Sequence, residues 1–93
     1  MMAHTAQCSN NGGPWRLYVV LFGETEWPAF SWSSGQAPTV AQRREALAAL
    51  GYEPLPHTEW RWIEDSAVPG DDSTAVLLIA STEVRELPAG GAA

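Results

Sequence analysis

The stretch PTVAQRREALAALG (residues 38–51) decides the fold, because it carries the clearest helix signals in the chain. Thr39 and Gln42 match a capping box, in which each residue satisfies a free backbone N–H of the other. Alanine and leucine then dominate up to Leu50, and Gly51 suits the left-handed conformation that follows a helix C-terminus. The sequence therefore predicts one helix that begins after Thr39 and ends at Leu50.

The spacing of apolar residues predicts which side of this helix is buried. An apolar stripe at helical spacing faces the core of a globular protein. The stripe consists of Val40, Ala46, Leu47 and Leu50. Polar side chains occupy the other side, and we expect Gln42, Arg43 and Glu45 to face water.

Two strands are predicted before the helix. Residues 15–22 are apolar or aromatic on both faces, which is typical of a central strand or of one whose second face is covered. Residues 23–26 favour a hairpin turn, and residues 27–33 form the second strand. Pro28 has no backbone donor, so this second strand should lie at an edge of the sheet.

Two more strands are predicted after the helix. Residues 58–64 form the third strand, with two tryptophans on one face. Residues 69–72 have the sequence Pro-Gly-Asp-Asp, which is a strong turn signal. The last strand runs from about residue 74 to residue 87, and its first half is apolar on both faces.

These elements predict an α+β fold in ββαββ order: a four-stranded antiparallel sheet with one helix packed on one face. Residues 15–87 form the single domain. Residues 1–14 and 88–93 are mostly small or polar, and we expect both to be disordered tails. Because one helix covers only one face, the apolar second face of the outer strands should be covered by other chain segments or by another subunit.

The charge balance restricts the partners. The chain of 93 residues has eleven acidic residues, five arginines and no lysine, for a net charge of −6. Nucleic acid and anionic membranes attract basic proteins, so neither is an expected partner, and a basic protein surface fits better. The longest apolar runs, residues 17–22 and 75–80, are too short to span a bilayer, and no signal peptide is visible. We expect a cytoplasmic location.

The residues that catalysis or metal binding would need are scattered. His4 and His57 are far apart in the sequence, and the lone Cys8, in the expected N-terminal tail, has no partner for an intramolecular disulfide. The acids at 65, 71 and 72 lack calcium-loop spacing, and the serines at 31, 33 and 34 lie in no nucleophile elbow. We therefore predict no enzymatic activity, no catalytic residue, no cofactor and no metal site.

Tryptophan is the unusual feature, with five residues in a short chain. One interpretation places three or four indoles in the core, with the rest covering it. The other exposes two or more indoles at a protein interface, where Trp and Arg concentrate binding energy. The candidate interface residues are Trp27, Trp32, Trp60, Arg61 and Trp62.

Several segments resemble a family of short actinobacterial proteins of unknown function. They are Trp15–Gly23, Trp27-Pro28, Ala46-Leu47, Leu50–Pro54 and Glu59–Trp62. The resemblance covers about residues 15–85 and implies no activity. A weaker resemblance, in Trp27–Phe30, is to MbtH-like proteins, which are partners of adenylation domains. The chain lacks their Pro-Gly-Trp turn, so no residue role is transferred.

Three functional hypotheses follow. The first is a non-enzymatic protein-interaction or regulatory module that binds a protein partner or self-associates as a homodimer. The second is a small-ligand-binding protein or minor enzyme with a cleft lined by Trp27, Trp60 and Trp62, and with Arg61 or His57 as polar partner. The third is an acidic mimic of nucleic acid, which would require the acids to line one face.

Overall fold

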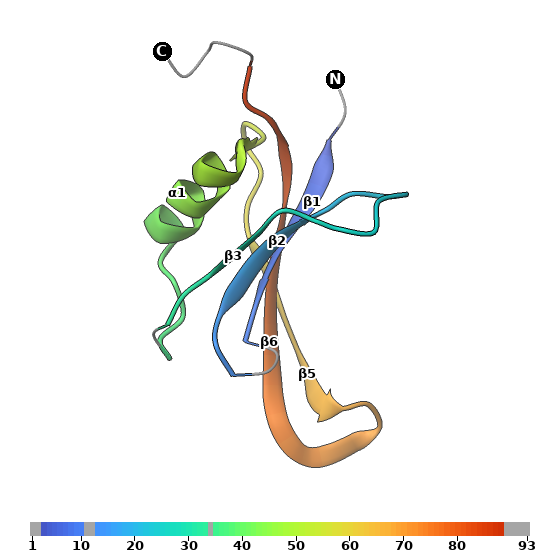
Figure 1. Cartoon of the computed structure of the whole chain (residues 1–93). Helices are drawn as coiled ribbons and strands as arrows, with labels where there is room; N and C mark the ends of the chain where they lie inside the picture. Colours follow the sequence, from blue (N-terminus) through green and yellow to red (C-terminus); the bar gives the residue numbers. More distant parts are fainter. Residues whose placement is uncertain (1–2, 11–12, 34, 89–93) are drawn as a thin grey trace.

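The computed structural model describes residues 3–10, 13–33 and 35–88. In chain order the elements are β1 (His4–Ser9), β2 (Arg16–Val20), β3 (Ala29–Ser31), α1 (Val40–Leu50), β4 (Tyr52–Pro54), β5 (Arg61–Val68) and β6 (Asp71–Glu86). All strand pairs are antiparallel and form one sheet, and α1 lies against one side of it (Figure 1). The predicted α+β class is confirmed.

The sheet has six strands, so the prediction of four strands in ββαββ order is wrong. The strand order is β3-β2-β1-β6-β4, and β5 pairs with residues 71–81 of β6. The two additional strands are β1 and β4. Because β6 is 16 residues long, it pairs with three different strands along its length.

Part of the expected N-terminal tail forms a strand, β1. β1 lies between β2 and β6, where Ala6 and Cys8 are fully buried. Its side chains are small or polar, so the segment has little hydrophobic signal, and pairing on both sides satisfies its backbone groups. Disorder is therefore the wrong prediction for residues 4–9. The expected C-terminal tail lies, apart from Pro88, outside the described residues.

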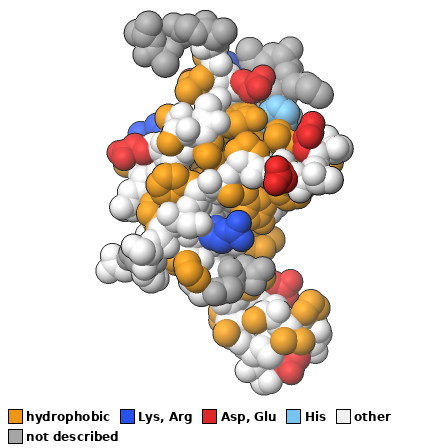
Figure 2. Space-filling model, in the orientation of Figure 1, with side chains coloured by type: hydrophobic (Ala, Val, Ile, Leu, Met, Phe, Trp, Pro, Cys, Tyr) orange, Lys and Arg blue, Asp and Glu red, His pale blue; other side chains and the backbone are white. Residues whose placement is uncertain are grey.

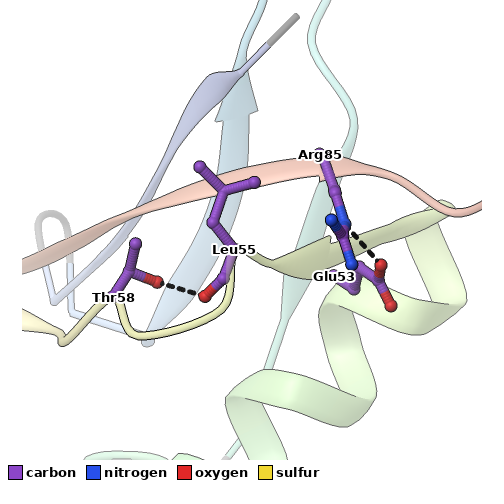
Figure 3. Close-up of polar contacts among 4 residues, drawn as sticks. All are labelled: Glu53, Leu55, Thr58 and Arg85. Carbon is purple, nitrogen blue, oxygen red and sulfur yellow. Dashed lines mark hydrogen bonds and ion pairs between the residues drawn. The ribbon is translucent and has the colours of Figure 1, made fainter. Parts of the chain in front are cut away.

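The fourth strand forms where only a connector was expected. Residues 52–54 pair with residues 84–86, and Glu53 makes a 2.6 Å ion pair with Arg85 directly opposite it (Figure 3). Beyond Pro54 the connector turns sharply, and the Thr58 hydroxyl donates to the Leu55 carbonyl oxygen at 2.8 Å. The ion pair and the turn hold the start of β5 close to β6.

The local signals around the helix are confirmed. The Thr39 hydroxyl accepts from the Gln42 backbone N–H at 3.1 Å, and the Gln42 side chain accepts from the Thr39 backbone N–H at 2.8 Å. Gly51 has φ of 94°, which is the left-handed region that glycine adopts without steric cost. The edge position of β3, next to Pro28, is also confirmed. Of the turn predicted over residues 69–72, residues 69 and 70 form the turn, and Asp71 and Asp72 already belong to β6.

The buried side of the helix differs from the prediction at two positions. Ala46 and Leu47 are buried as expected, but Val40 is 48% exposed. Arg43 was expected in water, yet only 5% of it is exposed. Arg43 lies three and four residues before Ala46 and Leu47, so helical spacing places it on the buried side; it was assigned to water because it is charged. Its guanidinium lies over the rings of Trp60 and Trp62.

The core lies between α1 and one face of the sheet. Register places Leu17, Cys8 and Ala80 side by side across three strands, and each of these residues is fully buried. The neighbouring row contains Val19 and Ala6, which are also fully buried. We call this side the helix face and the opposite side of the sheet the open face.

The hairpin of β5 and β6 extends well beyond the body of the protein (Figure 1). The longest dimension of the molecule is 48 Å, compared with 28 and 26 Å for the other two. β1 pairs with β6 only from Ile79 onward, so residues 71–77 have β5 as their one described strand partner. We call residues 63–78 the arm.

A pair of substitutions tests the central position of β1. Ala6→Lys puts an unpaired charge into the core, which costs several kcal/mol out of a total stability of about 5–15 kcal/mol. Thr5→Lys points to the open face opposite Glu83, and we expect the free energy of unfolding to change by less than about 1 kcal/mol. Urea unfolding followed by circular dichroism measures both. Equally small effects would contradict the buried position of β1.

Candidate functional site

The open face is polar at its centre because β1 supplies that part of the sheet. Register places Thr5, Gln7 and Ser9 on this face, between Tyr18 of β2 and Ser81 of β6. The expectation of an apolar second face therefore does not hold at the centre. Apolar side chains on this face are found nearer its margins, at Val20, Ile63 and Ile79.

A hollow of about 450 Å³ lies on the open face beside β2 and β3. Its lining residues are Ser9, Arg16, Tyr18, Glu24, Thr25, Trp27 and Ala29. Trp27 stacks on Tyr18, with ring centroids 5.9 Å apart and an interplanar angle of 23°. We call this feature the aromatic hollow.

Hydrogen bonds fix both rings of the aromatic hollow. The Trp27 indole Nε1–H donates to the Leu21 carbonyl oxygen at 2.9 Å. The Tyr18 hydroxyl donates to Gln7 Oε1 at 2.7 Å. Because each ring has a bond at its polar tip and a ring against its face, the pair needs no reordering to receive a ligand.

The helix face holds a different aromatic cluster, centred on Arg43. The Arg43 guanidinium lies 4.6 Å from the Trp60 ring centroid and 5.3 Å from that of Trp62. Its Nε–H donates to the Thr39 carbonyl oxygen at 3.3 Å. Trp62 in turn meets Trp15 edge to face, with centroids 6.0 Å apart. This cluster joins the helix to β5, through Trp62, and to the start of β2, through Trp15.

Burial shifts the pKa values of Arg43 and of Cys8, whose thiol interacts with the Arg43 charge. Desolvation lowers the pKa of Arg43, and the coulombic interaction with Cys8 opposes that shift. Burial also raises the pKa of the Cys8 thiol to about 11, against a smaller opposing effect of the Arg43 charge. The thiol is therefore protonated at neutral pH, and a protonated buried thiol is a poor nucleophile.

The candidate interface residues are divided between the two faces. Trp60 and Trp62 lie under Arg43 on the helix face, whereas Trp27 stacks on Tyr18 on the open face. Trp62 is 45% exposed and Trp27 is 43% exposed, while Trp60 is half-buried. The proposed cleft lined by all three indoles is therefore contradicted.

The other two candidate interface residues lie elsewhere. Trp32 is half-buried and packs on Phe30, with ring centroids 4.9 Å apart. Arg61 is exposed, and together with His57 it lines a second, polar hollow of about 440 Å³. His57 has φ of 66°, which is unusual for a residue with a side chain. Trp15, which is 4% exposed, is the one buried indole of the five.

Sequence reasoning missed the residues that shape the aromatic hollow. Tyr18 and Arg16 share a strand face, which alternation shows, but their neighbour Ser9 belongs to the strand that was expected to be disordered. The acids, in contrast, are spread over the β2–β3 turn, the helix, the connector to β5, the arm and β6. They do not line one face, so the structure does not meet the requirement of the nucleic-acid-mimic hypothesis.

The described residues contain no cluster suited to a metal ion and no helix suited to crossing a membrane. No group of three or more His, Cys, Asp or Glu side chains there could hold a metal ion. No helix in residues 3–10, 13–33 and 35–88 is long and apolar enough to cross a membrane.

A family model described as "Family of unknown function (DUF6303)" matches residues 2–92, almost the whole chain. The chain belongs to this family. No curated protein and no solved structure matches it. The predicted membership of an uncharacterised family is confirmed, and family membership assigns no activity to either hollow of this DUF6303 chain.

Substitution of the buried arginine tests its role in the DUF6303 fold. Arg43→Ala removes the packing and both cation–π contacts, so the free energy of unfolding should fall by about 2–4 kcal/mol. Arg43→Lys keeps the charge without the planar guanidinium and should lose about 1–2 kcal/mol. Arg44→Ala, at an exposed neighbour, is the control and should change stability by less than about 0.5 kcal/mol. Chemical denaturation measures all three, and equal effects at both positions would contradict the bridging role.

The Cys8 thiol should make stability depend on alkaline pH. Folding raises its pKa from the ordinary 9.0 to about 11, so its contribution is complete below about pH 9 and is lost as the pH rises through about 11. The free energy of unfolding should fall over this window, and it should fall less in Cys8→Ala. A thiol reagent at pH 8 should react with the unfolded chain much faster than with the folded one. Rapid labelling of the native protein would show that the thiol is accessible.

Proposed function

We propose that this chain is a non-enzymatic protein-interaction module whose contact element is the arm. Three apolar side chains of the arm are largely exposed: Ile63 at 61%, Val76 at 55% and Val68 at 52%. Figure 2 shows the projecting lobe with hydrophobic and acidic side chains close together on the visible face. Apolar surface concentrated on a projecting element is a feature of interaction sites.

The edges of the arm add backbone groups to this surface. β5 pairs with β6 and with no other strand of the described chain, and residues 71–77 of β6 lack a strand on the side away from β5. A two-stranded hairpin on its own is marginally stable in water. A partner that covers the arm would therefore both bury its apolar side chains and order its backbone.

Charge indicates what kind of partner fits. The arm carries Glu64, Asp65, Asp71 and Asp72 and no basic residue. Hydrogen bonds from the Ser73 hydroxyl and N–H hold the pKa of Asp71 below its ordinary value, so this carboxylate stays charged at neutral pH. Two copies of the arm would bring like charges together. We therefore propose a different protein, with an apolar surface bordered by Arg or Lys, as the partner.

The cytoplasmic location is part of this proposal. Cys8 is a free, buried thiol, and the chain has no second cysteine to pair with it. A reducing compartment suits such a chain, because it needs no disulfide for stability.

Charge and apolar variants of the arm test the proposal. The purified chain should be a monomer in size-exclusion chromatography with light scattering. In capture from a lysate of the native host, the chain should retain a discrete basic protein that both Val76→Lys and the double variant Glu64→Lys/Asp65→Lys lose. The captured protein, once purified, should bind with an affinity that falls with added salt and drops about tenfold or more for Val76→Lys.

Val40→Lys is the matched control, because Val40 is a valine of similar exposure on the helix. It should capture the same protein as the unmodified chain. A dimer that Val76→Lys dissociates would identify a second copy as the occupant and overturn the basic partner. Capture that is the same for all variants would remove the arm from the interface.

A further inference from the structure

We propose that the aromatic hollow on the open face binds an uncharged carbohydrate. The hollow holds an exposed, fixed indole surrounded by polar side chains that have no partner in the described protein. The hollow is formed by β1, β2, β3 and the turn after β2, whereas the arm belongs to β5 and β6. This site is therefore independent of the interaction surface proposed above.

The platform of the site is Trp27. One face of its indole packs on Tyr18, yet 43% of the residue remains exposed. Its Nε1–H is already bonded to the Leu21 carbonyl oxygen, so the ring offers a flat apolar surface rather than a free donor. A pyranose ring has a flat side formed by C–H groups, and such a surface can stack on an indole without leaving hydroxyl groups against the ring.

The rim of the site supplies complementary hydrogen-bonding groups. Among residues 3–10, 13–33 and 35–88, no hydrogen bond or ion pair occupies the side chains of Ser9, Arg16, Glu24 and Thr25. The guanidinium only donates, the carboxylate only accepts, and the two hydroxyls can do both. Sugar hydroxyls also donate and accept, so they match the exposed side chains of Arg16, Glu24 and Thr25, whereas Ser9 is only 5% exposed.

Charge and size separate carbohydrate from other planar ligands. Arg16 and Glu24 give the lining a net charge of zero, so the hollow offers no excess positive charge to a nucleotide phosphate. A wholly apolar ligand would desolvate both charged groups without pairing them, which is costly. A volume of about 450 Å³ lies within the usual range for small-molecule sites.

Titration of the full chain, labelled with ¹⁵N and observed by NMR, tests the site. The probes are glucose, N-acetylglucosamine, maltose, cellobiose and trehalose, with AMP and triglycine as charged comparisons. We expect at least one of the sugars to shift the Trp27 indole N–H and the amides of Arg16 and Glu24 in a saturable manner. Trp62 is the internal control, because it is similarly exposed but lies on the helix face.

Variants decide whether the shifts report binding at this surface. Trp27→Ala should weaken binding of the active sugar about tenfold or more, in line with loss of an aromatic stack. Arg16→Ala should also weaken it, whereas Trp62→Ala should leave the affinity unchanged. Circular dichroism confirms that each variant folds. No saturable shift with any of the sugars, stronger binding of AMP or triglycine, or equal shifts at Trp62 would each overturn the proposal.

Discussion

The contact between the Arg43 guanidinium and the rings of Trp60 and Trp62 holds the helix against the start of β5. The helix packs directly on β2, β3 and β4, and its reach toward β5 depends on this long side chain. Arginine suits the position because its flat, weakly hydrated head stacks on indoles and its stem is apolar. One guanidinium nitrogen, Nη1, is nevertheless buried without a hydrogen bond among the described residues, so this contact must offset a desolvation cost.

The composition of β1 gives the two faces of the sheet their different properties. Its inward side chains, Ala6 and Cys8, are small enough to let the helix approach, and its outward side chains are polar. The open face therefore has a polar centre, with the aromatic hollow on the β2 side. The exposed apolar side chains Ile63, Val68 and Val76 lie on the arm, where the sheet consists of two strands only. The buried apolar packing that stabilises the fold therefore lies on the helix face. The surfaces suited to binding lie on the open face and at the end of the β5–β6 hairpin.

Local signals in the sequence predict local structure well, and signals that depend on distant partners do not. The capping box at Thr39, the glycine at 51 and the proline at 28 each act through their own backbone, so the helix ends and the edge strand are predictable. β1 pairs locally with β2 on one edge, but on its other edge it pairs with residues of β6 about 70–80 positions away, and its own side chains give little apolar signal. The same limit applies to the sites: Trp27 was named as a candidate interface residue, but its separation from Trp60 depends on strand register.

The pairing of β1 with β6 has a consequence for synthesis of the chain. Of the strands in the described residues, β1 is synthesised first, and one of its two neighbours, β6, is synthesised last. Until then one side of β1 has no partner, and the indoles that later lie under Arg43 have an incomplete sheet to pack on. A nascent chain of this kind completes its core only after β6 has been synthesised, and before that moment it exposes apolar surface that general chaperones bind.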